Sequence, residues 1–215
     1  MSDIQADNQV TIKKPNFVIN AIGQTNILSS KIFLLSLLHV KYKTDAYQND
    51  MSQEDIEFYK ELQKRTKADF SRGLVAEMPI RELVKEMGLS VSGKTYDMIY
   101  EHMLYSFTSQ WNLLLNDEYG VGSTAIVTSS YFNRENSIVY IKFSEEEEIQ
   151  KELIDAKNKF SLLQKDIMMA IRNDYAFRLY EILVSQIGLV NGRCKDRNLS
   201  TYKFEFGLAE LKYKA

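Results

Sequence analysis

The stretch MPIRELVKEMGLSVSGKTYDMIYEHMLYSFTSQWNLLL, residues 78–115, decides the fold of this chain. Apolar residues recur at helical spacing over 80–87, and Gly88 supplies the left-handed residue that ends a helix. After a turn, a longer repeat predicts a second helix over 96–107 whose apolar face holds Tyr96, Ile99, Tyr100, Met103, Leu104 and Phe107. Two such helices joined by a short turn form a helix-turn-helix, which DNA-binding proteins use.

The outward face of the second helix is expected to be mixed in charge. It holds Lys94, Thr95, Asp97, Met98, Glu101 and His102. The carboxylates would repel backbone phosphate in places, so this face suits auxiliary backbone contacts or a protein contact better than base reading. The candidate DNA contacts from the turn and the helix start are Ser90, Ser92, Lys94 and Thr95.

The same residues allow a second interpretation. The octet Gly88–Thr95 fits G-x-x-x-x-G-K-[ST], the pattern of a loop that cradles nucleotide phosphates. Such a loop must follow a buried strand, whereas this octet follows an amphipathic helix. A nucleotide-binding protein therefore stays only as a minor alternative, and in the helix-turn-helix interpretation Ser92 or Thr95 caps the following helix.

Composition favours a cytoplasmic, non-catalytic protein. The single cysteine, Cys194, excludes an internal disulfide, and two histidines leave little for metal or general-base chemistry, so we expect no catalytic residues, metal or cofactor. No apolar run approaches the ~20 residues that span a bilayer, and the polar start MSDIQADNQV lacks the features of a signal peptide. We therefore expect no membrane partner.

Upstream of this stretch the sequence predicts a flexible arm and two helices. Residues 1–14 form the arm, and 17–22 an extended or short helical segment. The first helix runs from a cap at Ser29 or Ser30 to about Lys43 and, being apolar nearly all round, belongs to the core. The second runs from Ser52 to about Lys67, and the charged residues 65–72 lead on to the helix-turn-helix. Residues 44–72 are not explained by a winged-helix core and are interpreted as an insertion into it, without an assigned role.

Downstream, alternation predicts strands over 111–116, 123–132 and 137–143. The polar residues 133–136 would form the hairpin turn between the last two strands. A helix-turn-helix followed by a hairpin is a winged helix, and Asn133, Arg134 and Asn136 become candidate wing-tip contacts to DNA. An ordinary solvated turn is the equal alternative.

Three helices and a basic C-terminal region complete the prediction. The helices span 144–157, with Ser144 and Glu147 in a capping box, then 161–171, then Asn173 or Asp174 to Ile187 with Arg178 on its polar side. A strand over 202–206 and a helix from Leu208 follow. Between Gln186 and Ala215 six basic residues outnumber three acidic ones, so Arg193, Lys195 and Arg197 join Arg178 as candidate phosphate contacts.

These residues carry a resemblance. The run DYAFRLYEIL, residues 174–183, is similar to S-x-Y-[AS]-x-R-L-Y-E-L-L of plasmid replication initiators of the Rep_3 type, which bind iterons through tandem winged helices. KKPNFVINA with the apolar helix after it, PIRELVKEMGL and the strand end IKFSEE also resemble that family's first domain. The similarity covers most of residues 11–215.

The resemblance implies an α+β, helix-rich fold: a winged-helix domain followed by the start of a second one. Residues 15–160 would form the first domain, for dimerisation and auxiliary DNA contact. Residues 161–215 would form the first part of the second, apparently truncated before its recognition helix and wing. The implied function is a noncatalytic bacterial initiator that binds origin repeats in double-stranded DNA and recruits host replication proteins, while its homodimer acts in autoregulation or copy control. A winged-helix transcriptional regulator or an interaction domain is the alternative.

Overall fold

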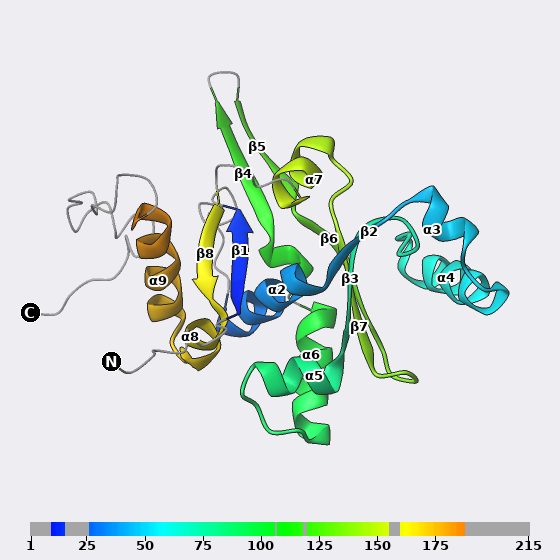
Figure 1. The fold of residues 1–215 in the computed structure, drawn as a ribbon, viewed down its shortest axis with the longest axis horizontal. Helices are drawn as coiled ribbons and strands as arrows, with labels where there is room; N and C mark the ends of the chain where they lie inside the picture. The colour runs from blue at the N-terminus through cyan, green and yellow to red at the C-terminus, as the bar shows by residue number, and fades with distance from the viewer. Residues whose placement is uncertain (1–9, 16–25, 106, 118–119, 155–159, 188–215) are drawn as a thin grey trace, which may run out of the picture.

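The structure is a computed structural model that describes residues 10–15, 26–105, 107–117, 120–154 and 160–187 (Figure 1). Its elements are, in chain order, β1 (Thr11–Pro15), α2 (Ile27–His39), β2 (Val40–Lys43), α3 (Asp45–Asn49), α4 (Gln53–Thr66), β3 (Gly73–Pro79), α5 (Ile80–Glu86), α6 (Gly93–Tyr105), a 3-10 turn η1 (Thr108–Gln110), β4 (Asn112–Asp117), β5 (Gly120–Ala125), β6 (Val127–Asn133), β7 (Ile138–Phe143), α7 (Glu147–Ile154), β8 (Phe160–Gln164), α8 (Lys165–Ala170) and α9 (Asp174–Ile187).

A four-stranded antiparallel sheet in the order β2-β3-β7-β6 lies at the centre of the fold. Its inner face carries Leu74, Ala76, Met78, Val139, Ile141 and Phe143, which share one core with α2, α5 and α6. Strand β3 leads into α5 and α6, and β6 and β7 return as a hairpin (Figure 1). This order of elements is a winged helix, as predicted.

Helix α2 is the core helix that the sequence predicts. Every side chain from Ile32 to Leu35 is fully buried, and Phe33 stacks on Trp111 with ring centroids 3.8 Å apart. Its predicted bounds were wrong at both ends. Asn26 caps it by accepting the Ser29 amide at 2.8 Å, and the residues after His39 leave the helix to pair with β3. Backbone pairing with a neighbouring strand thus overrides the helical apolar pattern there.

The outer face of the sheet is covered by residues 44–72, the insertion, which contributes α3 and α4. Tyr59, Leu62 and Phe70 of the insertion form a second, smaller core with Val75 of β3 and Tyr140 of β7. Ser52 caps α4 by accepting the Asp55 amide, so the helix predicted from Ser52 to Lys67 is confirmed. The sequence missed α3, and it also missed β3, because it treated the chain before the helix-turn-helix as a charged connection.

Strands β1 and β8 pair antiparallel beside α2 and form a two-stranded ribbon between the N-terminal and C-terminal parts of the chain (Figure 1). The helix predicted over 161–171 was wrong in its first half, because residues 160–164 pair with β1 and only 165–170 are helical. Ser161 and Leu163 are buried in this pairing while Leu162 between them is exposed, which is the alternation of a strand. The predicted domain boundary after residue 160 falls at this strand, and it stays a prediction.

The remaining differences concern the hairpins and the capping of α7. The strand predicted over 123–132 is two strands, because β5 pairs with β4 in a separate hairpin and β6 with β7. In Figure 1 the β4–β5 hairpin projects away from the rest of the fold. Helix α7 begins at Glu147, and Ser144 accepts the Glu146 amide, so the predicted capping box is wrong. Helix α9 is confirmed, with Asn173 accepting the amides of Tyr175 and Ala176.

The flexible arm predicted over 1–14 was wrong for 11–14, because these residues pair with β8 and bury Ile12 and Lys14. The predictions for residues 1–9, 17–22, 202–206 and 208–214 lie outside the described residues. Among the helices of the described ranges, none is both long and apolar enough to cross a bilayer.

Candidate nucleic-acid interface

The turn of the helix-turn-helix is built by one glycine and one serine. Gly88 follows α5 with φ of +69°, the left-handed conformation that the sequence predicts. Ser92 then caps α6, since its hydroxyl accepts the Thr95 amide at 3.2 Å and contacts the Thr95 hydroxyl at 2.9 Å. The helix therefore begins at Gly93, which confirms Ser92 rather than Thr95 as its cap, and Lys94 and Thr95 lie in its first turn. Ser90, Ser92 and Lys94 are exposed there and Thr95 is half-buried.

This geometry also explains the phosphate-loop pattern. The octet Gly88–Thr95 joins two helices, and its last three residues belong to α6. Strand β3 ends at Pro79 and is separated from the octet by α5, so the strand-to-loop transition of a nucleotide site is missing from this described region. The helix-turn-helix interpretation of the octet is therefore confirmed.

Helix α6 buries one face and exposes another. Ile99 and Met103 lie in the core as predicted. Leu104 was wrongly placed on the apolar face, since it is 56% exposed, and Phe107 lies beyond the helix end. His102 was wrongly placed on the outward face, because Ser29 of α2 lies 2.6 Å from its Nε2 atom. Burial lowers the pKa of the His102 ring, so this side chain is an internal contact rather than a cationic one.

Asp97, Met98 and Glu101 share the outward surface of α6 with Lys94 and the largely exposed Tyr105. Within the described residues, neither Asp97 nor Glu101 has an ion-pair partner. The predicted mixed surface is therefore present, and its positive charge is confined to the N-terminal turn.

The wing is the β6–β7 hairpin, and two of its three candidate residues build the turn. Asn133 is buried and accepts the Glu135 amide at 2.9 Å. Asn136 accepts the Ile138 amide at 3.2 Å and donates to the Tyr140 hydroxyl at 3.3 Å. Both side chains are thus engaged in shaping the hairpin, which leaves Arg134 as the exposed cation of the wing tip.

Arg134 connects the wing to α6. Its guanidinium lies 4.0 Å from the centroid of the Tyr100 ring, and Tyr100 also packs against Phe132 of β6. A cation over an aromatic face is attracted by the ring quadrupole, which restrains the arginine without neutralising it. The structure thereby brings the wing tip and the recognition-type helix α6 into one surface.

Arg178 lies elsewhere, in a buried ion network that the sequence did not predict. Its guanidinium is 3.3 Å from a carboxylate oxygen of Glu181, whose other oxygen accepts from Lys14 of β1 at 2.5 Å. Lys14 and Glu181 are both almost fully buried, and the ammonium lies 5.5 Å from the centroid of the Trp111 ring. Burial lowers the pKa of Lys14, and Glu181 opposes this shift by holding the ammonium charged. Arg178 thus pairs with Glu181 within α9, and Glu181 is the residue that links α9 to β1 in the described chain.

The i, i+3 spacing of Arg178 and Glu181 within R-L-Y-E could have indicated their pairing, but no local pattern points to Lys14, 167 residues away. Arg193, Lys195 and Arg197 lie outside the described residues. In the described part of the chain, histidine, cysteine and carboxylate side chains form no group of three or more that could hold a metal.

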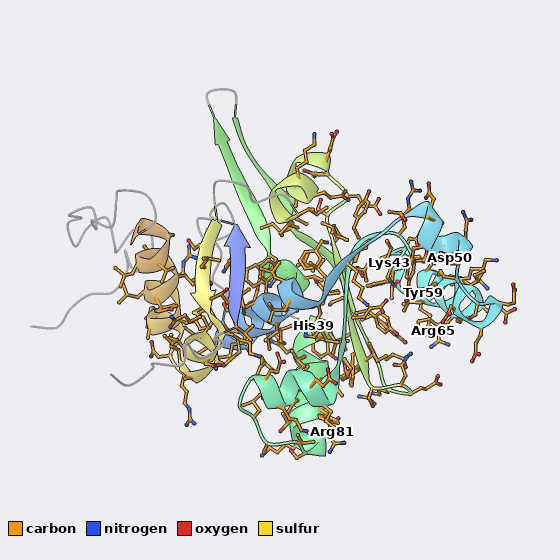
Figure 2. All side chains as sticks on the ribbon, in the orientation of Figure 1. His39, Lys43, Asp50, Tyr59, Arg65 and Arg81 are labelled. Carbon is orange, nitrogen blue, oxygen red and sulfur yellow. The ribbon has the colours of Figure 1, made fainter. Side chains whose placement is uncertain are left out.

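A second buried cation attaches the insertion to the sheet. Lys43 donates to the Tyr59 hydroxyl at 2.8 Å and the Phe70 carbonyl at 3.1 Å, and it also pairs with Glu77 of β3. Burial lowers the pKa of Lys43, whereas burial raises that of Tyr59. Figure 2 shows Lys43 and Tyr59 between the sheet and α4. This cluster positions α4 on the outer face beside the wing strands.

Comparison with known proteins agrees with this geometry. The chain is similar in fold to a solved structure described as "Crystal structure of Pi initiator protein in complex with iteron DNA", with a TM-score of 0.59 and 12% identity over 96% of this chain and 76% of that chain. No curated protein sequence matches. Residues 11–184 match the family described as "Initiator Replication protein, WH1". Because this match spans most of the chain, the protein belongs to the initiator replication protein family and contains its WH1 winged helix.

Proposed function

We propose that this protein binds the repeated sites, or iterons, of a plasmid origin in double-stranded DNA, with α6 and the wing contacting the phosphate backbone. The observation that carries the proposal is the surface formed by the capped N-terminus of α6, with Lys94 and Thr95, and by Arg134 on Tyr100. Free amides and the helix dipole make a helix N-terminus favourable for phosphate, and Lys94 adds a full charge there.

The charges of α6 favour backbone contacts over base reading by this domain. Asp97 and Glu101 lie on the part of the helix that would enter the major groove, where they would approach phosphates on either side. Carboxylates can accept from cytosine, but phosphate contacts supply register and affinity without sequence information. This winged helix therefore positions the protein, and most sequence discrimination comes from other residues.

The finer parts of the function rest on family membership and on the similarity to an initiator whose structure holds iteron DNA. The protein acts without catalysis in the bacterial cytoplasm and recruits host replication proteins, while its homodimer serves autoregulation or copy control. Ser90 and Ser92 add contacts beside Lys94. Arg193, Lys195 and Arg197 add positive charge beyond the described residues.

The experiment is a binding titration on two duplexes at two salt concentrations. One duplex carries the tandem repeats that we expect beside the gene, and the other a scrambled sequence of equal length. Each phosphate contact contributes about 0.9 to the slope of log affinity against log salt, so a few contacts give a clear salt dependence with modest discrimination. Absence of binding at low salt would remove the proposal. Selective binding to operators far from any repeats would favour the transcriptional regulator instead.

A second candidate role, protein association, is favoured by the exposed apolar side chains of α6. Met98, Leu104 and Tyr105 are exposed apolar side chains there, and Tyr105 is 77% exposed. Exposed apolar groups rimmed by charge are typical of association surfaces, and the family implies a homodimer. Sedimentation would show weaker self-association for Tyr105→Glu than for Leu162→Glu, a matched change on β8. Equal behaviour of both variants would argue against this surface.

A further inference from the structure

We propose that the insertion extends the DNA-contacting surface past the wing, with Lys64 and Lys67 at the C-terminal end of α4 contacting backbone phosphate and Arg65 fixing that end against the wing. This inference rests on the proposed DNA binding and assigns a role to residues 44–72. It concerns a contact that α6 and the wing tip do not supply.

The first step is that α4 is held rigidly to the sheet. Phe58 packs against Tyr140 of β7 with ring centroids 5.8 Å apart, and Tyr59 and Leu62 are buried on the outer face. The buried Lys43 bonds both Tyr59 of α4 and Glu77 of β3. Charged groups on α4 therefore keep a fixed position relative to the wing strands.

The second step is that α4 and α6 flank the wing on opposite faces. On the inner face, Tyr100 of α6 packs against Phe132 of β6 and carries Arg134. On the outer face, Tyr131 of β6 packs with the insertion core, and the Arg65 guanidinium, which pairs with Glu61 at 3.1 Å, also interacts electrostatically with the Tyr131 hydroxyl. Neighbouring residues of one strand thus contact α6 and α4, and Figure 2 shows Arg65 on the side of α4 toward the hairpin. DNA seated on α6 and the wing tip would next meet α4.

The third step is the charge at this end of α4. Acidic residues gather in the first turn, with Glu54 and Asp55, whereas the last turn carries Lys64 and Arg65 and is followed by Lys67. The Lys64 side chain is 78% exposed and lies 3.8 Å from Glu61, a distance at which an exposed pair holds little energy. Lys64 is therefore available to a phosphate at little energetic cost.

Lys67 supplies an independent observation. It lies just past the helix with φ of +62°, a conformation that glycine or asparagine adopts more easily. Cations near a helix C-terminus interact favourably with the helix dipole, which accounts for Lys64 and Arg65 without any ligand. The dipole effect does not explain why a residue with a left-handed backbone conformation should be lysine. A phosphate contact gives a reason for lysine at position 67.

The test compares two double variants of the full chain. Lys64→Gln with Lys67→Asn removes both charges, and asparagine tolerates the left-handed backbone. The control, Lys41→Gln with Lys151→Gln, removes two exposed charges on β2 and α7, away from the wing. Affinity for the repeat duplex is measured against salt, and hydroxyl-radical footprinting maps the protected phosphates.

We expect the α4 variant to lower the salt slope by about 1.8, since each lost contact removes about 0.9, and to shorten the footprint on the wing side. The control variant should keep the wild-type footprint, and its slope of log affinity against log salt should fall by less than that of the α4 variant. If the wild type binds DNA and the two variants behave alike, this inference is wrong while the proposed function stands. If the wild type does not bind, the proposed function itself fails. Matching melting temperatures for the two variants would show that lost folding is not the cause.

Discussion

The two faces of the four-stranded sheet are covered in different ways. The inner face meets α2, α5 and α6 mainly through apolar side chains, whereas the outer face meets α4 through a small apolar cluster and the buried Lys43. A second buried lysine, Lys14, attaches α9 in the same manner. Apolar packing is non-directional and tolerates adjustment, but a buried charge needs its partner at one position. Apolar packing therefore forms the winged helix itself, whereas buried ion pairs attach α4 and α9 to the rest of the fold.

The largest expected effect comes from breaking the buried pair between β1 and α9. Replacing Glu181 with alanine leaves the Lys14 ammonium buried and unpaired, which costs about 3–5 kcal/mol of the free energy of unfolding. Chemical denaturation measures this loss.

The double variant Lys14→Met with Glu181→Leu serves as its control, since removing both charges together costs far less than removing one. If the double variant lost as much stability as Glu181→Ala, the attachment of α9 to β1 would depend on the volume of the two side chains and not on their charges. The contrast between apolar packing and buried ion pairs would then disappear.

On the inner face, the free energy of unfolding should depend on the volume of the buried side chains. Leu83 of α5 is buried in the core that α5 shares with α2, α6 and the inner face, so Leu83→Ala should cost about 2–5 kcal/mol through lost contacts and a residual cavity. Lys94→Ala on the exposed start of α6 should change stability by less than about 0.5 kcal/mol. The two variants are compared by urea denaturation, and similar losses would show that the faces of these helices are assigned wrongly.

A smaller, pH-dependent effect is expected from His102, which joins α6 to α2. Because burial lowers the pKa of His102 in the folded protein, the unfolded chain binds its proton more readily. Stability from this residue is therefore complete above the unfolded pKa of about 6.5 and is lost as pH falls through the lower folded pKa. The variant His102→Asn should show a smaller loss between pH 7 and 5 when melting temperatures are compared. Identical pH profiles would contradict the assignment.

The sequence predicted the winged helix because its signals are local. The spacing of Ile80, Leu83 and Val84 indicates α5, and Gly88 and Ser92 indicate the ends of the turn. The polar residues 133–136 indicate the hairpin. Each of these features depends on residues a few positions apart. The α2–α5–α6 core and the wing could therefore be placed without a structure.

The remaining features depend on residues far apart in the chain. Strand β8 was predicted as helix because its partner β1 lies about 150 residues earlier, and β2 was assigned to the preceding helix for the same kind of reason. Lys14, Lys43 and Glu181 look like ordinary polar positions in sequence, and only tertiary packing buries them. In the candidate interface, Lys94 and Arg134 were predicted from local pattern, whereas the turn-building roles of Asn133 and Asn136 required the hydrogen bonds.

The most direct test of the account is photocrosslinking to a repeat duplex from single positions on the surface. The photoreactive residue benzoylphenylalanine is placed at Lys94, at Arg134 and, as the control, at the exposed Leu162 of β8. We expect crosslinks from positions 94 and 134, reduced by added salt, and none from position 162. A protein that binds the duplex yet crosslinks from 162 and from neither 94 nor 134 would contradict DNA contact by α6 and the wing.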